Sequence, residues 1–238
     1  MKNNQNCKIV VPFFNDFENF KSFIDQISLI KEKEKYFLII DNGSDDDKIE
    51  EFYLNCKKEK IVWDFIKIPK NHGFGGAIQY SIEHVDEDFI AWMPGNMKVD
   101  PLDAYNLIQQ DLFKQPYVLT KSWRVERKLI PKIKTLLFSF IASIWFTTPL
   151  FDNGGTPNIM SKEILKKLDN APSNFSFDFY IFYFFKFNRY KVLRPKVPYR
   201  SRLHGKSHWQ NSFKAEVDLV KYILFQKTQW KSHFLKIH

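Results

Sequence analysis

The first half of the chain alternates between short apolar runs and segments whose apolar residues recur at helical spacing. An apolar run bounded by turn residues is typical of a buried strand, whereas recurrence every three or four residues is typical of an amphipathic helix. The runs that predict strands are CKIVVPFF, YFLII, IVWDFIKI (61–68), FIAWM and YVLT. Helices are predicted after Asp16, over 48–56 and 77–84, and from Pro101 onward. Strand and helix in this alternation specify a parallel sheet with helices on both faces.

The pattern loosens after about residue 120. Helical spacing predicts helices over 130–146, 161–168, 176–187 and 213–225, with a strand near 192–199. A chain of 238 residues that is 44% hydrophobic is long enough to bury a full core as one domain. We therefore expect the second half to cover a site formed by the first half, and not to fold as an independent domain.

Polar clusters follow four of the predicted strands. They are Asn15–Asp16 and residues 41–45, 71–76 and 96–98. The carboxyl ends of parallel strands meet at one rim of a sheet, and that rim is where such sheets bind ligands. The sequence therefore predicts a binding site at this rim.

Two of these clusters suggest particular ligands. Backbone N–H groups of the loop NHGFGG, at a helix start, allow an anion to approach closely. Asp41 follows a strand and is placed to accept hydrogen bonds from a ribose or a base. The alternative is that Asp41 and Asp45 cap the next turn.

The positive charge is concentrated in the last quarter of the chain. The net charge is +9, and residues 186–238 carry 13 Lys and Arg against two acids, whereas the remainder carries 23 against 25. This excess indicates a polyanionic partner, which is an anionic membrane surface, a phosphorylated ligand or nucleic acid. A solvated lysine-rich face is the alternative.

Two stretches are strongly apolar. Residues 135–151 carry no charge, and nine of the 13 residues in 175–187 are aromatic. Neither reaches the roughly 20 residues of a spanning helix. Buried helices account for both, and a position at a membrane interface is the alternative. Isolated Cys7 and Cys56 and an N-terminus unlike a signal peptide favour a reduced, cytoplasmic protein.

The clusters together resemble a known family. VVPFFND, IIDNGSDD, NHGFGGAI and WMPGNMKVDP follow in the order and spacing of family 2 glycosyltransferases with the GT-A fold. FDNGGTPNIMSKEIL, FSFDFYIFYFFK and VPYRSRLHGKSHW resemble the polyprenyl-phosphate (dolichol-phosphate) mannosyltransferase-like branch. The resemblance covers residues 8 to about 210.

This resemblance implies an α/β fold of GT-A type, with a Rossmann-like, mostly parallel sheet flanked by helices and a helical, basic C-terminal part. It implies one domain over 1–238, in which residues 1–120 bind the nucleotide-sugar, 121–210 form the acceptor side and 211–238 form a basic tail.

The implied activity is transfer of a sugar, with inversion, from a nucleotide-diphosphate sugar to a membrane-linked acceptor. A polyprenyl phosphate is the preferred acceptor, and the implied location is cytoplasmic and peripheral, on the inner face of the membrane. Transfer to a saccharide hydroxyl in surface polysaccharide assembly is one alternative, and a degenerate, non-catalytic nucleotide-sugar-binding protein is another. Nucleic acid is the weakest candidate partner because no recognition module is present.

Matching the family motifs residue by residue gives the candidate site. The implied donor-binding residues are Pro12, Asn15, Asp16, Asp41, Asn42, Ser44, Asn71, Gly73, Gly95 and Asn96. The implied acceptor-binding residues are Arg124, Arg127, Arg202, Lys206 and Ser207.

Two acids match positions on the acceptor side, Asp152 and Asp178. A hydroxyl acceptor requires one of them as general base, whereas a lipid phosphate is already ionised and requires none. In the phosphate case Arg202 takes part directly at the acceptor.

The turn after the fourth strand lacks the metal-binding acids of the family. The Asp-x-Asp sequence that holds a divalent cation there aligns with Pro94-Gly95-Asn96, and Asp100 is placed to cap the helix that begins at Pro101. Three alternatives follow. Lys98 supplies the positive charge in place of the metal, Asn96 holds Mg²⁺ or Mn²⁺ weakly through its carbonyl oxygen, or the protein binds without turnover.

Overall fold

The computed structural model describes residues 7–59, 63–110, 112, 115–205 and 213–237. It contains a seven-stranded sheet of order β3-β2-β1-β4-β7-β5-β8, and a second sheet pairs β6 with β9. The strands are β1 (Cys7–Phe13), β2 (Phe37–Asp41), β3 (Asp64–Lys67), β4 (Phe89–Trp92), β5 (Val118–Lys121), β6 (Trp123–Val125), β7 (Asn158–Ser161), β8 (Lys191–Leu193) and β9 (Lys196–Pro198). The helices are α1 (Phe17–Ile27), α2 (Lys48–Lys58), α3 (Gly73–Ser81), α4 (Pro101–Ile108), α5 (Leu129–Phe146), α6 (Lys162–Lys167), α7 (Phe177–Phe187), α8 (Phe213–Phe225) and α9 (Lys227–Phe234), with short 3₁₀ turns η1 (Lys33–Lys35) and η2 (Ile82–His84).

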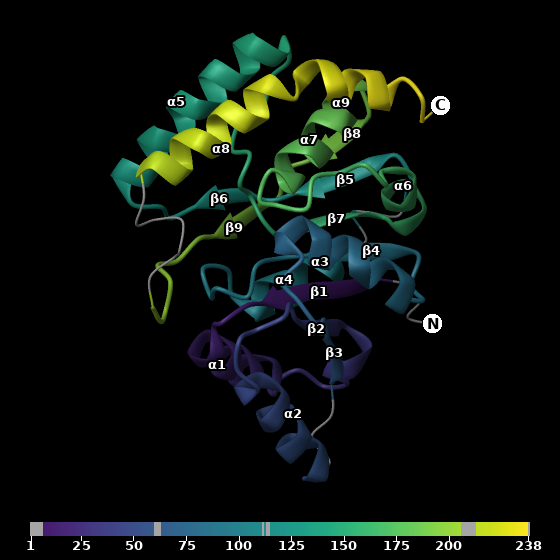
Figure 1. Cartoon of the computed structure of the whole chain (residues 1–238), viewed down its shortest axis with the longest axis vertical. Helices are drawn as coiled ribbons and strands as arrows, with labels where there is room; N and C mark the ends of the chain where they lie inside the picture. The colour runs from purple at the N-terminus through teal and green to yellow at the C-terminus, as the bar shows by residue number, and fades with distance from the viewer. Residues whose placement is uncertain (1–6, 60–62, 111, 113–114, 206–212, 238) are drawn as a thin grey trace.

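The sheet separates two hydrophobic cores, as the alternation of strands and helices predicts. Every residue of β1 and β2 is buried, which is typical of parallel strands covered on both faces. Side chains of α1, α2 and α4 pack on one face, and those of α3, α6 and α7 pack on the other. Helices α5, α8 and α9 add an outer layer over α7 (Figure 1). The prediction of a mostly parallel sheet with helices on both faces is confirmed.

One strand runs against the others, which the sequence did not predict. β7 lies between β4 and β5 and is antiparallel to both, with Trp92 opposite Asn158. The remaining pairs of the large sheet are parallel. The loop that enters β7 therefore lies beside the turn that leaves β4.

The strand expected near 192–199 is two strands in different sheets. β8 pairs with β5, whereas β9 pairs with β6. Pro195 lies between them and has no N–H to continue a ladder, although its carbonyl accepts the N–H of Trp123 at 2.7 Å. This break places Arg194 at a crossing between the two sheets. The opening residues of the predicted strand 61–68 lie outside the described residues.

Two helices differ from expectation in ways that affect the site. α3 begins at Gly73, not at residue 77, so the glycines of the NHGFGG loop form its first turn. A Cβ on Gly75 would lie 2.3 Å from the carbonyl oxygen of Pro172, so this turn packs too closely for any other residue. α7 buries every residue from Phe177 to Phe185 except the half-buried Asp178, so the membrane-interface alternative is wrong for this helix.

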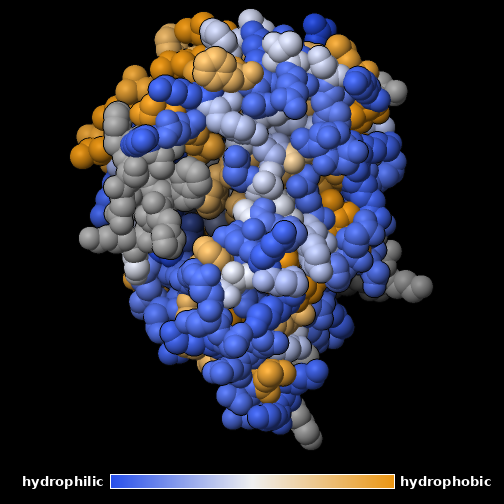
Figure 2. All heavy atoms as spheres, in the orientation of Figure 1, coloured by the Kyte–Doolittle hydropathy of each residue, from blue (hydrophilic) through white to orange (hydrophobic). Residues whose placement is uncertain are grey.

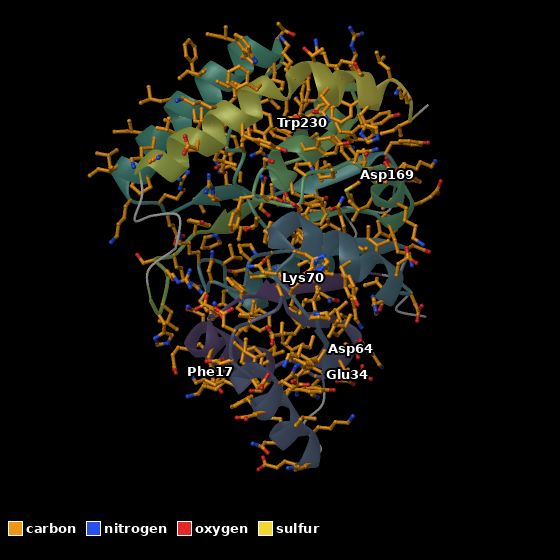
Figure 3. The ribbon with its side chains drawn as sticks, viewed as in Figure 1. Phe17, Glu34, Asp64, Lys70, Asp169 and Trp230 are labelled. Atoms are coloured by element: carbon orange, nitrogen blue, oxygen red, sulfur yellow. The ribbon has the colours of Figure 1, made fainter. Side chains whose placement is uncertain are left out.

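The C-terminal helices complete the larger core. α8 has the predicted bounds, whereas α9 was not predicted. Trp230 of α9 points into the core against Tyr180 of α7, with ring centroids 5.3 Å apart (Figure 3). Cys7 and Cys56 are both free thiols.

Candidate active site

The loops after β2 and β3 are joined at the carboxyl rim of the sheet. Asn42 donates from Nδ2 to Asn71 Oδ1 (3.2 Å) and to the carbonyl of Gly73 (3.1 Å), and its Oδ1 accepts the N–H of His72 (3.2 Å). Gly43, at φ +72°, allows this close approach, since a Cβ there would lie 2.3 Å from the carbonyl carbon of Lys70. Three predicted donor-binding residues, Asn42, Asn71 and Gly73, therefore form one connected unit.

Asp41 ends β2 at this rim and is fully buried. Its Oδ1 accepts the N–H of Ser44 at 3.0 Å, as the turn-capping alternative expects. Its Oδ2 makes no hydrogen bond with the residues that the structure describes. A buried carboxylate oxygen without a partner is costly, so this atom is suited to a donor group on a ligand.

The loops after β1 and β2 border an open hollow of about 590 Å³. Asn15 donates its N–H to Ser44 Oγ (3.0 Å) and its Nδ2 to Asp45 Oδ2 (2.6 Å), and its Oδ1 accepts the backbone N–H of Asp45 (2.8 Å). Asp16, Phe17 and Gly205 also line the hollow, and Phe17 is labelled in Figure 3. The lining mixes polar and apolar side chains, and it includes three predicted donor-binding residues, Asn15, Asp16 and Ser44.

The acid-free turn after β4 has defined internal contacts. Asn96 Oδ1 accepts the N–H of Lys98 at 3.2 Å, and Met97 has a positive φ of 57°. A Cβ on Gly95 would lie 2.3 Å from the ring of Phe13, next to Pro12 in β1. Asp100 caps α4 by accepting the N–H of Leu102 at 2.9 Å, as predicted.

The donor set of this turn does not fit a divalent cation held by protein carboxylates. The amide oxygen of Asn96 is already a hydrogen-bond acceptor, and the ammonium group follows two residues later on Lys98. Among the residues that the structure describes, no group of three or more His, Cys, Asp or Glu side chains is arranged to hold a metal. The turn Pro94–Lys98 itself carries the positive charge of Lys98 and no acid.

A buried ion pair forms the centre of the second half. Arg124 donates its backbone N–H to Asp152 Oδ2 (2.8 Å) and its Nε to Oδ1 (2.7 Å), and Arg127 lies 3.6 Å from the same carboxylate. Arg194 binds the carbonyl of Asp152 at 3.2 Å. Burial alone would raise the pKa of Asp152, but the charge and hydrogen bonds of Arg124 hold the pKa below its usual range. Two guanidinium groups thus lie against the carboxylate of Asp152, and a third binds the backbone of the same residue.

Tyr199, which follows β9, connects this ion pair to the turn after β4. The guanidinium carbons of Arg124 and Arg127 lie 5.0 and 5.8 Å from its ring centroid, and Lys98 Nζ lies at 5.9 Å. The adjacent backbone supports this arrangement, because the N–H of Arg200 donates to the carbonyl of Lys98 at 2.7 Å. We call Lys98, Arg124, Arg127 and Arg194 the cationic cluster.

Asp178 is half-buried and lies in a separate polar group with the buried residues Trp92, Lys121 and Asn158. It accepts from Trp92 Nε1 (2.7 Å) and from Asn158 Nδ2 (3.2 Å), and burial raises the pKa of its carboxyl. Lys121 Nζ donates to the carbonyl of Gly155 and to Asn158 Oδ1, both at 3.1 Å. Burial lowers the pKa of Lys121 to about 8, although the charge of Asp178 opposes the shift.

The pKa of Lys121 predicts an alkaline rise in stability. The folded protein loses this proton near pH 8, whereas the unfolded chain keeps it to about 10.5, so the unfolded state binds more protons between these values. The free energy of unfolding of the wild type should therefore increase relative to that of Lys121→Met as the pH rises from 8 toward 10.5. Urea denaturation of both proteins across this range measures the difference. A constant difference would show that Lys121 is not shifted.

The loop after β9 brings a donor candidate and an acceptor candidate together. Arg202 forms an ion pair with Asp16, and its Nε donates to the carbonyl of His204 at 2.7 Å. The backbone N–H of His204 also donates to Oδ1 of Asn19 in α1, at 3.1 Å. The loop therefore lies against α1 (Figure 1). The predicted acceptor residues Lys206 and Ser207 lie outside the described residues.

Sequence reasoning missed three residues of the site: Lys121, Arg194 and Tyr199. Lys121 is a charged residue at the end of an apolar run, and that anomaly was the available signal. Arg194 and Tyr199 follow short strands whose pairing is not apparent from local pattern. The roles predicted for Asp152, Asp178 and Arg202 stay predictions. The two carboxylates and the guanidinium group already have protein partners.

The parallel strands, the joined loops at their carboxyl rim and the cation-lined second half define a fold of the GT-A type. The chain belongs to glycosyl transferase family 2, whose model matches residues 8–169.

The chain is similar to one curated relative and to several solved structures. It is 23% identical over 166 residues to a dodecaprenyl-phosphate galacturonate synthase from Rhizobium johnstonii, covering 67% of this chain and 49% of the relative. The chain thus spans about half the length of that relative. Glucosyl-3-phosphoglycerate synthase from Mycobacterium tuberculosis, solved with Mn²⁺, UDP-glucose and phosphoglyceric acid, matches with a TM-score of 0.68 over 96% of this chain and 79% of that chain, at 16% identity. The same enzyme with Mg²⁺ and UDP matches with a TM-score of 0.63 over 95% and 78%, at 17% identity.

Proposed function

We propose that this protein transfers a sugar from a nucleotide-diphosphate sugar to a membrane-linked phosphate of the polyprenyl phosphate type. The observation that carries the proposal is the cationic cluster around Asp152 and Tyr199. Arg124 and Asp152 neutralise each other, so Arg127 and Arg194 are left as partly buried cations in excess of the carboxylate. Burial lowers the pKa of both guanidinium groups, which means that an anion bound beside them would relieve an electrostatic cost.

The acids on the acceptor side support a phosphate over a hydroxyl. A hydroxyl must give up its proton to a general base within hydrogen-bond reach. Asp152 is bound to Arg124 with a lowered pKa, and the carboxylate of Asp178 already accepts hydrogen bonds from Trp92 and Asn158. An ionised phosphate oxygen attacks the anomeric carbon without a base, and the bond to the nucleotide diphosphate breaks with its electron pair on the leaving oxygen.

The donor rim supplies the remaining groups. We assign the nucleoside to the Asp41 oxygen without a partner and to the joined loop of Asn42 and Asn71. We assign the diphosphate to Lys98, whose side chain shares the ring of Tyr199 with Arg124. Its ammonium group stabilises the departing diphosphate, and any Mg²⁺ or Mn²⁺ would be held weakly, chiefly by the diphosphate itself.

The names of two similar proteins support a phosphate-bearing acceptor. The curated relative is a dodecaprenyl-phosphate galacturonate synthase, and its match covers 67% of this chain. The solved enzyme was crystallised with UDP-glucose and with phosphoglyceric acid, which also carries a phosphate.

Arg127 provides the test of the acceptor. Arg127→Ala should raise the KM for a short-chain polyprenyl phosphate by about tenfold or more, because a charge-assisted hydrogen bond to phosphate is lost. Affinity for the nucleotide-sugar should not change. The assay is radiolabelled sugar transfer from a panel of UDP- and GDP-sugars, with Lys196→Ala as the control, since Lys196 is an exposed cation on the same small sheet. Transfer to saccharide hydroxyls without transfer to polyprenyl phosphate would overturn the proposal.

A further inference from the structure

Helix α5 exposes large apolar side chains along its whole length. They include Leu129, Ile130, Leu137, Phe140, Ile144 and Trp145, each between 51% and 71% exposed. Phe225 of the adjacent α8 is 82% exposed. Figure 2 shows hydrophobic atoms gathered at the upper left, where Figure 1 places α5 beside α8. We call this surface the apolar face, and its continuity distinguishes it from scattered exposed side chains.

Cations flank the apolar face at both ends. The segment 127–151 contains no acid, and Lys128 and Lys132 are exposed where α5 begins. At the other end, Lys227 lies 5.7 Å from the ring of Trp145 and donates to the carbonyl of that residue. An apolar stripe with flanking lysines and an interfacial tryptophan complements an anionic bilayer surface.

The contacts of α5 hold it flat against the protein. Ser139 Oγ on its inner side accepts the N–H of Asp152 at 3.2 Å, and Trp145 Nε1 donates to the carbonyl of Leu224 at 2.9 Å. By length and composition α5 would also qualify as a membrane span, with a mean hydropathy of 1.5 over its 18 residues. Crossing a bilayer would break these contacts and expose Asp152, so a position parallel to the surface fits the structure.

A second copy of the chain fits the apolar face less well. In a symmetric pair the cationic ends of the two faces would meet each other, whichever way the helices run, because Lys132 marks one end and Lys227 the other. Like charges brought together at an interface oppose association. The chain as a whole also carries a net charge of +9.

We infer that the apolar face of α5 docks on an anionic bilayer as an interfacial helix, with the cationic cluster beneath it. Asp152 contacts the inner side of α5 through Ser139, so one helix diameter, about 10 Å, separates the bilayer from the acceptor side. Arg127 precedes the helix by two residues and binds Thr135 in its second turn at 2.7 Å. Because Arg127 also lies 3.6 Å from Asp152, docking leaves this guanidinium on the acceptor side beneath the helix. The link to the acceptor rests on the proposed function, whereas the docking itself does not.

Vesicle flotation tests the docking directly. The wild type should float with vesicles of phosphatidylcholine and phosphatidylglycerol at low salt, and less with phosphatidylcholine alone. The triple variant Leu137→Gln/Phe140→Gln/Ile144→Gln should lose about tenfold or more of its vesicle partitioning, because its net charge is unchanged and only apolar surface is removed.

A matched control tests whether vesicle partitioning depends on α5 or on the total exposed apolar surface of the protein. Leu29→Gln/Leu54→Gln/Leu235→Gln changes three exposed leucines on other helices and loops and should float like the wild type. The stabilisation of each variant by UDP in a thermal-shift assay reports an intact donor site, and transfer to a water-soluble, short-chain polyprenyl phosphate reports the proposed function separately.

The outcomes are distinct. Equal flotation of the two triple variants, or no flotation of the wild type, would overturn the docking. If the α5 variant changes the oligomeric mass in light scattering while no form binds vesicles, the apolar face is a contact between copies and the inference is wrong. Flotation together with failure of transfer to the soluble acceptor would leave the docking in place and refute the proposed reaction.

Discussion

Replacing Lys98 with alanine should lower the turnover number by about 100- to 1,000-fold, the range found when one preorganised electrostatic group is removed from an active site. The turn Pro94–Lys98 offers an amide and an ammonium where the family pattern has acids, and Lys98 lies over the ring that also contacts Arg124 and Arg127. In the proposed reaction this side chain supplies positive charge to the leaving diphosphate. Activity should change little when EDTA is added to the wild type, because no protein carboxylates in this turn hold the metal.

The measurement is steady-state transfer combined with calorimetric titration of UDP and GDP, each with EDTA and with Mn²⁺. Lys98→Arg should retain more activity than Lys98→Ala because the charge is kept. Lys57→Ala, an exposed lysine on α2, is the matched control. If EDTA abolishes transfer and Lys98→Ala has no effect, a metal and not the lysine supplies the charge.

Arg124→Ala should cost about 3–5 kcal/mol of folding free energy, the range for removing one partner from a buried ion pair. The side chains of Arg124 and Asp152 are only 9% and 7% exposed, and Arg124 makes both backbone and side-chain hydrogen bonds to the carboxylate. Without Arg124, the carboxylate of Asp152 loses its hydrogen-bonded partner. Only Arg127, 3.6 Å away, remains as a compensating charge on that carboxylate. Urea denaturation at neutral pH measures the loss.

The matched comparison is Arg200→Ala. Arg200 pairs with Asp100, but its side chain is 53% exposed, so we expect a loss below about 1 kcal/mol. Similar losses for the two variants would mean that the Arg124–Asp152 pair contributes no more than a surface contact.

The first half of the fold could be predicted because its signals are local. The runs CKIVVPF and FLIID bury every side chain, so continuous hydrophobicity identified both strands and their parallel pairing followed from the intervening helix. Asp100 as the cap of α4 also depends only on neighbours in sequence.

The second half depends on contacts between distant residues. β7 has only four residues, and its antiparallel place between β4 and β5 results from pairing across about 70 and 40 positions of sequence, respectively. The burial of Lys121 requires Asn158 and the carbonyl of Gly155 as partners. The helices α5 and α7 are similarly hydrophobic as a whole, although α5 is largely exposed and α7 largely buried, so composition alone could not tell them apart.

The antiparallel strand β7 has a consequence for dividing this protein into parts. β4 pairs with β1 on one side and with β7 on the other, and the indole of Trp92 donates to Asp178. A fragment that ends near residue 120 would leave one side of β4 with unpaired backbone groups beside an uncovered tryptophan. Such a strand is a template for aggregation. The donor half therefore cannot be exchanged between relatives as a self-contained module unless the β7 segment is transferred with it.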